Sequence, residues 1–166
     1  FNSNSAQSAP SMASRDPDEQ FNYENIISGS KDLKDHLLEQ VGVESYPDYV
    51  LTVADAIVNN LNPSGYLELT KDEIINELGV SKEEFEETLE IILRLDPIGC
   101  GSSSLEECLI NQARILGYHS ELLQDLITNH LQRIKNKQFD KIAEVTGREK
   151  ELIMSAIELL KELNPR

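Results

Sequence analysis

Residues 95–109 have the sequence Leu95-Asp96-Pro97-Ile98-Gly99-Cys100-Gly101-Ser102-Ser103-Ser104-Leu105-Glu106-Glu107-Cys108-Leu109, and the rest of the chain is organised around them. Proline disfavours the helical conformation in the residue before it, so a helix is predicted to end at Asp96. Two glycines then form a turn, and a second helix is predicted to begin at Ser104. Ser104 and Glu107 have the spacing of a capping box, in which each side chain bonds a backbone N–H of the other residue. The stretch therefore predicts a sharp corner between two helices.

The composition favours an all-α protein. Of the 166 residues, 39% are hydrophobic and only 5% are aromatic, with no tryptophan. A chain of this length forms one domain or two small ones. The scarcity of aromatic side chains favours helices packed through Leu, Ile and Val over a sandwich or a barrel.

The chain is strongly acidic. It has 15 Lys and Arg against 30 Asp and Glu, a formal net charge of −15 at pH 7. Such a surface repels the phosphates of nucleic acids, so we expect no direct nucleic-acid partner. No apolar run approaches the roughly 18 residues of a membrane span, and the N-terminus lacks the order of a signal peptide. We therefore expect a soluble, cytoplasmic protein without a membrane partner.

Residues 1–30 are predicted to be a disordered acidic tail. They have little periodicity and contain one basic and four acidic residues. Such a stretch cannot bury enough apolar surface to offset the entropy lost on ordering. The weak exception is one apolar group: Phe21, Tyr23, Ile26 and Ile27. We interpret this group as part of the tail, and docking on a partner or on the following domain is the alternative.

Helical spacing of apolar residues begins at Leu33. Apolar residues three and four positions apart predict six successive helices, at about residues 33–41, 47–61, 71–78, 82–96, 105–116 and 122–134. Gly42 and Gly117 are predicted to end the first and the fifth. Thr70 and Glu73 predict a capping box at the start of the third.

A short unit with the pattern of a helix-turn-helix occurs twice. Leu78-Gly79-Val80-Ser81 joins two amphipathic helices through a tight glycine turn, and Ser81 is predicted to cap the second helix together with Glu84. An offset of 68 residues places Gly147 on Gly79 and pairs further residues of the last segment with the earlier one: Asp140 with Asp72, Ile142 with Ile74, Lys150 with Lys82, Leu163 with Leu95 and Pro165 with Pro97. We predict two small helical subdomains, 31–117 and 118–166, with about eight helices in all.

The second helix of the first unit is too acidic for DNA. Its exposed positions carry one lysine and five glutamates: Lys82, Glu83, Glu84, Glu86, Glu87 and Glu90. Contact with DNA needs several Lys or Arg side chains. We therefore interpret the unit as protein-binding, with Glu86 and Glu87 as candidate contacts. A solvated face without a partner and a DNA-binding regulator are the alternatives.

The sequence favours a binding protein over an enzyme. Cys100 lies between two glycines, as an exposed nucleophile does, but His36, His119 and His130 are scattered and supply no positioned base. Cys100 and Cys108 form neither a disulfide framework nor a common zinc-ligand spacing. We expect no catalysis, no metal and no cofactor, and an enzyme with Cys100 as nucleophile is the remaining alternative.

The corner resembles the core-binding region of the enhancer-dependent bacterial sigma factors, the sigma-54 class. The signature of that class is close to Leu-Asp-Pro-x-Gly-x-Gly-x-x-x-Leu-x-Glu-Cys-Leu-x-x-Gln, and the matching residues are Leu95, Asp96, Pro97, Gly99, Gly101, Leu105, Glu107, Cys108, Leu109 and Gln112. Segments 33–40, 61–67 and 78–81 support the resemblance, which covers residues 24–166.

The resemblance implies an all-helical module that attaches a sigma factor to core RNA polymerase. The signature residues would shape the corner or touch polymerase, and only the exposed ones can touch it. The resemblance also implies a monomeric fragment that does not recognise a promoter alone, in a full-length protein that works with an enhancer-binding activator. Two departures are present: Ser102-Ser103-Ser104 stands where the family often has a small residue, Arg and Asp, and Cys100 replaces a common Val.

Overall fold

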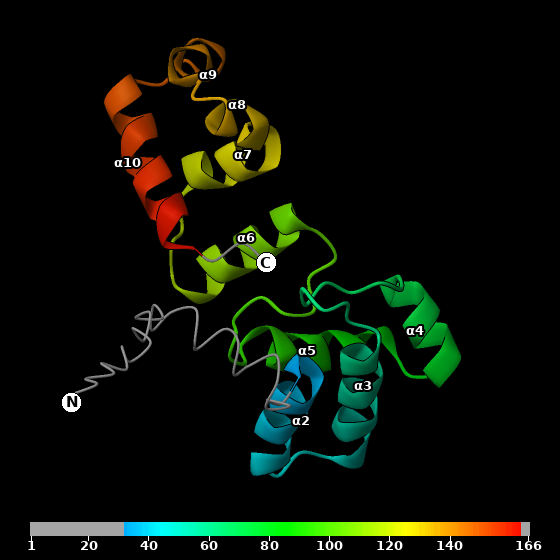
Figure 1. Cartoon of the computed structure of the whole chain (residues 1–166). Helices are drawn as coiled ribbons and strands as arrows, with labels where there is room; N and C mark the ends of the chain where they lie inside the picture. The colour runs from blue at the N-terminus through cyan, green and yellow to red at the C-terminus, as the bar shows by residue number, and fades with distance from the viewer. Residues whose placement is uncertain (1–31, 164–166) are drawn as a thin grey trace, which may run out of the picture. The chain divides into compact units, whose positions relative to one another are not determined.

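The computed structural model describes residues 32–163, and within this range the regular elements are all helices. The nine helices are α2 (Leu33–Val43), α3 (Asp48–Asn59), α4 (Lys71–Leu78), α5 (Lys82–Leu93), α6 (Leu105–Ile115), α7 (Glu121–Asn129), α8 (Leu131–Lys135), α9 (Phe139–Thr146) and α10 (Lys150–Glu162) (Figure 1). The all-α prediction is confirmed for these residues. The predicted tail at 1–30 and its apolar group lie outside the described range, as does Pro165.

The predicted signals at the starts of α4 and α5 are confirmed. Thr70 and Glu73 form a complete capping box at α4, and Ser81 and Glu84 form another at α5. Each box satisfies backbone N–H groups that a helix start leaves without a partner. Gly79 ends α4 with a left-handed backbone (φ +67°), which turns the chain into α5 and confirms the predicted helix-turn-helix.

Two predicted helix ends are wrong. Gly42 lies inside α2, which continues to Val43. Helix α5 ends at Leu93 and not at Asp96, because the N–H groups of Arg94 and Leu95 bond carbonyls three residues back instead of four. Asp96 lies beyond the helix, where the side chain of Gln40 bonds both its N–H and its carbonyl. The backbone groups of Asp96 are thereby held by α2 and do not continue the helix.

The predicted helix at 122–134 is two helices, which explains why nine are found where about eight were expected. The break is at His130, whose backbone (φ −128°, ψ 9°) lies outside the helical region. The ring of His130 is buried, and its Nδ1 lies 2.9 Å from Nη1 of Arg133, within hydrogen-bond distance. Apolar spacing continues across the break through Leu131 and Ile134, so periodicity alone did not reveal it.

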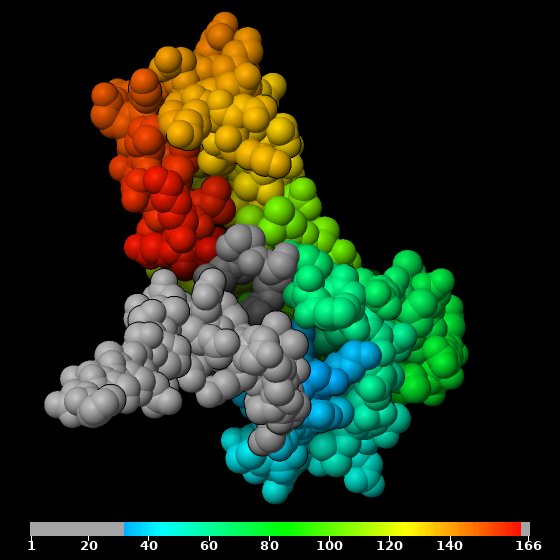
Figure 2. Space-filling view, in the orientation of Figure 1, coloured from blue at the N-terminus to red at the C-terminus, as the bar shows by residue number. Residues whose placement is uncertain are grey.

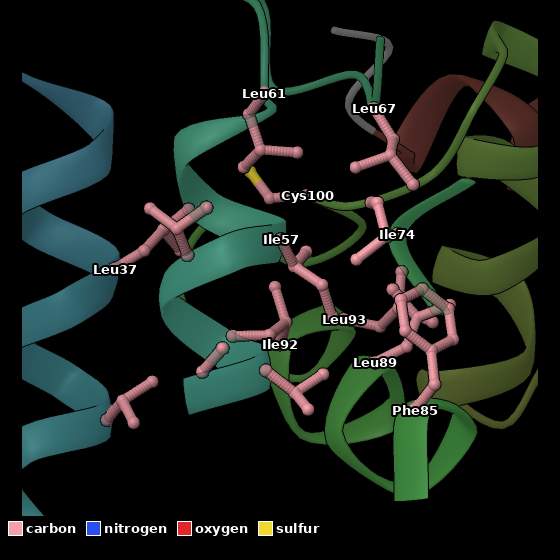
Figure 3. Close-up of a cluster of buried hydrophobic side chains, with 14 residues drawn as sticks. Leu37, Ile57, Leu61, Leu67, Ile74, Phe85, Leu89, Ile92, Leu93 and Cys100 are labelled. Carbon is pink, nitrogen blue, oxygen red and sulfur yellow. The ribbon is translucent and has the colours of Figure 1, made fainter. Parts of the chain in front are cut away.

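The first hydrophobic core lies among α2, α3, α4 and α5. Helices α2 and α3 lie side by side (Figure 1), and their atoms, blue to blue-green, adjoin one another in Figure 2. Helix α3 also packs on α5. Ile57, Ile92 and Leu93 converge between α3 and α5 (Figure 3). The buried residues of this core are Leu37, Val41, Val53, Ala54, Ile57, Val58, Leu61, Leu67, Ile74, Phe85, Leu89, Ile92, Leu93 and Cys100. The absence of tryptophan fits a core in which aliphatic side chains do most of the packing.

Two smaller cores involve the helices after the corner. Leu109 and Ala113 of α6 pack with Leu123, Ile127 and Leu163 in one of them. The other core joins α7, α9 and α10 through Leu126, Ile142, Ile153, Ala156 and Ile157. Helix α6 therefore begins at the corner and shares a hydrophobic core with α7 and Leu163.

The helix boundaries of the two predicted repeat units correspond. Helix α9 begins and ends exactly 68 residues after α4, and α10 begins 68 residues after α5. Gly147 ends α9 with φ +66°, close to the +67° of Gly79. The paired side chains Phe85 and Ile153 are both fully buried. The two units therefore share their helix boundaries, the turn glycine and the buried apolar positions.

The turn glycines Gly79 and Gly147 are expected to contribute equally to the free energy of unfolding. We predict that Gly79→Ala and Gly147→Ala each lower the free energy of unfolding by about 1 kcal/mol, because an L side chain is disfavoured at positive φ. A Cβ at either position meets nothing within 4 Å, so the cost is conformational only. Urea unfolding measures it, with Gly42→Ala in α2 as the control. An unchanged free energy of unfolding in either variant would contradict the prediction.

Candidate functional site

The corner between α5 and α6 is held by backbone hydrogen bonds to a distant turn. Gly101 donates its N–H to the carbonyl of Gly65 at 3.0 Å, and Leu67 donates to the carbonyl of Ser102 at 2.9 Å. The turn is itself closed by an isolated antiparallel bridge between Leu61 and Leu67. The segments 61–67 and 95–104, which both carry family-like sequence, therefore meet at one place.

Both corner glycines are required by their surroundings. Gly99 and Gly101 have φ values of +96° and +103°, which L side chains rarely adopt. A Cβ on Gly99 would lie 2.9 Å from Sγ of Cys108, and one on Gly101 would lie 3.1 Å from Cδ1 of Leu89. Because glycine has no side chain, the turn packs closely on α5 and α6 at these two positions.

The interior of the corner contains bonded polar groups. Ser102 is fully buried, and its hydroxyl donates to the carbonyl of Gly99 at 2.8 Å. Asn111 donates its side-chain amide to the same hydroxyl at 3.0 Å. Gln112 is also buried, and its Nε2 lies 3.2 Å from Sγ of Cys108. Buried polar groups of this kind cost stability unless they are bonded, so they fix one arrangement of the turn against α6.

Helix α2 is joined to the corner through Asp96. The Gln40 side chain accepts from the Asp96 N–H at 2.8 Å and donates to its carbonyl, as a neighbouring strand would. Nε2 of His36 lies 3.3 Å from the Asp96 carboxylate. Both side chains come from the segment 33–40 that supports the family resemblance. A third family-like segment therefore meets the corner.

The predicted capping box at α6 is only half formed. Ser104 accepts from the N–H of Glu107 at 3.1 Å, as expected. Glu107 accepts in return from the N–H of Ser103 at 2.6 Å, and not from that of Ser104. Nζ of Lys71 lies 3.7 Å from the Glu107 carboxylate, which links the start of α4 to the start of α6.

The sequence-predicted site residues divide by exposure. Five of them are buried: Gly99, Gly101, Cys108, Leu109 and Gln112. Three are partly buried: Leu95, Pro97 and Glu107. Four are exposed: Asp96, Leu105, Glu86 and Glu87. The buried ones shape the corner, and the exposed ones are accessible to another protein.

Cys100 does not have the setting of a nucleophile. Its side chain is fully buried in the first core, near Leu61 (Figure 3). A catalytic thiol needs access to substrate and a neighbouring base. Among residues 32–163, moreover, no three His, Cys, Asp or Glu side chains are grouped as a metal site would require. In the same range, no helix combines the length and the apolar character needed to cross a bilayer.

The two candidate glutamates of α5 lie side by side in sequence but have different partners. Glu87 accepts a hydrogen bond from the hydroxyl of Tyr49 on α3 at 3.0 Å, which raises the pKa of Tyr49. Glu86 is 45% exposed, and its carboxylate lies 3.8 Å from Nζ of Lys71. Each therefore keeps a largely exposed carboxylate on the surface of a well-packed helix.

A stronger ion pair joins α5 to α6. Arg114 donates to both carboxylate oxygens of Glu90 at 2.8 Å, and Arg94 donates to the same group at 2.9 Å. The hydrogen bonds from Arg114 are the main reason that the pKa of Glu90 lies below its ordinary value. Neither this pair nor the Gln40–Asp96 contact is predicted by the sequence pattern. The residues of each pair are 24 and 56 positions apart, and no local pattern announces them.

Replacement of Gly101 tests the geometry of the corner. We predict that Gly101→Val lowers the free energy of unfolding by about 3 kcal/mol or more, from backbone strain at φ +103° and a clash with Leu89. Urea unfolding measures the loss, and Gly42→Ala again serves as control. A loss below about 1 kcal/mol would contradict the required role of this glycine.

The pH dependence of stability tests the ion pair between α5 and α6. Because the folded state lowers the pKa of Glu90, the pair stabilises the fold above the ordinary glutamate pKa and loses its effect as pH falls below it. A double-mutant cycle with Glu90→Gln and Arg114→Gln is expected to give a coupling below about 1 kcal/mol at pH 7, because both groups are partly exposed. The coupling should fall as the pH drops below the ordinary glutamate pKa and through the lowered pKa of Glu90. A coupling that is unchanged at low pH would contradict the assignment.

Comparison with known proteins places the chain in a family. Residues 22–166 match the family described as sigma-54 factor, core binding domain. The chain is similar to the RNA polymerase sigma-54 factors of Salmonella typhimurium (30% identical over 143 residues, 82% of this chain), Pseudomonas aeruginosa (31% over 166 residues, 96%) and Shewanella violacea (32% over 162 residues, 94%). It spans 30%, 33% and 32%, respectively, of the lengths of these curated relatives. The chain belongs to the sigma-54 factor core-binding domains, a non-catalytic family whose similarity extends through the corner and both helix-turn-helix units.

Proposed function

We propose that this chain docks on core RNA polymerase and thereby contributes to the holoenzyme of a sigma-54-type initiation factor. The single observation that carries the proposal is the family match over residues 22–166. The buried corner supports it, because the corner holds α2, α5 and α6 in one arrangement and leaves several signature side chains accessible. The function is binding, without a chemical step.

The contact surface in this proposal includes the exposed face of α5 and the exposed rim of the corner. Glu86 and Glu87 supply negative charge on α5, and Asp96 has a side chain that is 84% exposed. Leu105, 38% exposed at the start of α6, supplies an apolar anchor. Charge of this kind mainly sets the rate and register of association, while buried apolar anchors set the lifetime of a complex.

Two helical subdomains, 31–117 and 118–166, form the docking module in this proposal, behind an acidic tail at 1–30. The first core, built from α2 to α5, supports a separate N-terminal unit. Leu109 and Ala113 of α6 share a core with α7 and with Leu163, so α6 connects the two units. We infer that the module acts as a cytoplasmic monomer, and that a full-length protein containing it responds to an enhancer-binding activator.

Direct nucleic-acid binding is not part of the proposal. The net charge of −15 and the five glutamates of α5 oppose approach to a phosphate backbone. A gel shift with duplex DNA at low salt tests this point. A tight complex in the absence of core polymerase would favour the alternative of a helix-turn-helix DNA-binding regulator.

Charge reversal on α5 tests the docking surface. We predict that Glu86→Lys with Glu87→Lys raises the Kd for purified core RNA polymerase on the order of tenfold at low salt, since two attractive charges become repulsive. The difference should shrink as salt screens these exposed charges. Titration of labelled chain with core enzyme measures the Kd, and thermal melts show whether the variant stays folded.

A matched control is available on α10. Glu158 is paired with Lys161 at 3.1 Å, and Glu162 accepts a hydrogen bond from Tyr118 at 2.8 Å, much as the α5 pair contacts a lysine and a tyrosine. Glu158→Lys with Glu162→Lys therefore makes the same change in net charge and loses comparable contacts. It should bind core polymerase within about twofold of the unaltered chain, as expected for charges outside the interface. Equal binding by a folded Glu86, Glu87 variant would remove α5 from the interface.

A further inference from the structure

The side chain of Gln40 is fixed by three hydrogen bonds where α2 meets the corner. Its Oε1 accepts from the N–H of Asp96 at 2.8 Å, and its Nε2 donates to the carbonyl of the same residue. Nε2 also donates to the carbonyl of His36, one turn earlier in α2, at 3.3 Å. A primary amide has two N–H donors, and both are used here. The position of the Gln40 amide is therefore set by its own helix as well as by Asp96.

The carboxylate of Asp96 is tethered to the same helix but stays in solvent. His36 and Gln40 are four residues apart, so they lie on one face of α2. Nε2 of His36 lies 3.3 Å from Oδ2 of Asp96, within hydrogen-bond distance, and the side chain of Asp96 is 84% exposed. Helix α2 thus contacts both polar main-chain groups of Asp96 and one oxygen of its carboxylate without covering that carboxylate.

A held but exposed carboxylate is of more use to binding than to folding. The contact with His36 joins two side chains that are 44% and 84% exposed, and contacts between groups so accessible to water are weak. A surface side chain that is already ordered, however, loses less entropy when a partner binds it. The bonds from Gln40 fix the main chain on both sides of the Asp96 Cα, and this sets the direction in which the side chain leaves the corner.

We propose that Gln40 and His36 are positioning residues, which hold the Asp96 carboxylate in the orientation that meets a basic side chain of core RNA polymerase. The inference rests on the proposed function, in which Asp96 belongs to the contact surface, and it adds two residues of α2 that act through Asp96. The chemistry of the partner group follows from charge, because an exposed carboxylate pairs with Lys or Arg.

A double-mutant cycle between Gln40 and Asp96 in the full chain tests the positioning role. Gln40→Met removes the amide and keeps a helix-compatible side chain of similar length, whereas Asp96→Asn removes the charge and keeps the shape. In the chain with Asp96, Gln40→Met is expected to raise the Kd for core RNA polymerase about fivefold, the size expected for one side chain that must be ordered on binding. In the Asp96→Asn background the same substitution should change the Kd by less than about twofold, because no charge is left to orient.

The stability of the fold separates positioning from a purely structural role. Gln40 bonds the main chain of Asp96, and these bonds can form in the Asp96→Asn variant as well. Urea unfolding should therefore show the same loss of stability from Gln40→Met in both backgrounds, while the effect on the Kd appears in only one. His36→Leu, which removes the contact with the carboxylate, should also raise the Kd only where Asp96 is present.

The matched control is a substitution that destabilises the fold away from Asp96. Ser120 accepts from the N–H of Leu123 at 3.2 Å at the start of α7, and Ser120→Ala removes this cap. The variant should be less stable than the unaltered chain and should bind core polymerase equally well, because the contacts of Asp96 are intact.

The outcomes distinguish this inference from the proposed function. No binding of core polymerase by the unaltered chain would overturn both. Binding by the unaltered chain together with equal binding by the Asp96→Asn variant would overturn the inference alone. So would a Kd that Gln40→Met leaves unchanged, or raises by the same factor in both backgrounds. Equal weakening by Ser120→Ala would also overturn the inference, because binding would then follow stability.

Discussion

The fold depends on how the backbone of residues 95–104 is bonded. This stretch contains a proline and two glycines at positive φ, so it cannot satisfy its peptide groups in a helix. Some of its N–H groups bond nearby carbonyls, as Gly99 does with Leu93. Other partners come from far away in sequence: the turn at Gly65 and Leu67 bonds Gly101 and Ser102, and the side chain of Gln40 bonds Asp96. Since a buried peptide group without a partner is costly, the three segments hold one another in place. The direction in which α6 leaves α5 follows from this set of bonds.

Charge is distributed unevenly on this scaffold. Glu90 is bonded by Arg114 and Arg94, and Glu107 lies near Lys71. These acids therefore form ion pairs between neighbouring helices. Glu86 lies 3.8 Å from Nζ of Lys71, and Glu87 accepts a hydrogen bond from the neutral hydroxyl of Tyr49. The negative charge of these two glutamates is therefore neutralised less than that of Glu90. The acidic residues of this chain therefore differ in what they contact. Acids at helix junctions stabilise the structure, whereas acids on the free face of α5 remain available to a basic protein.

Much of the helical architecture could be predicted from the sequence, because it depends on local rules. Apolar spacing located the helices, and Thr70 and Ser81 located two of their starts. The break at His130 was missed, because the apolar period continues through it. At the site, the glycine turn was predictable, but the bonds of Asp96 to Gln40 were not, since residues so far apart leave no periodic signal. The glycines around Cys100 suggested access, whereas they bring its side chain into the core.

The repeated unit shows why a helix-turn-helix backbone does not by itself indicate DNA binding. Packing constrains the inward positions, and the paired residues there are alike: Ile74 and Ile142 are both buried, as are Leu89 and Ile157. Outward positions contribute little to the fold, so Glu77 and Val145 occupy the same place with opposite chemistry. The turn glycine and the buried apolar residues are the features that the two units share. Their exposed side chains differ: those of the first unit are mostly acidic, whereas the second unit carries both charge signs and the exposed aliphatic residues Val145 and Leu152.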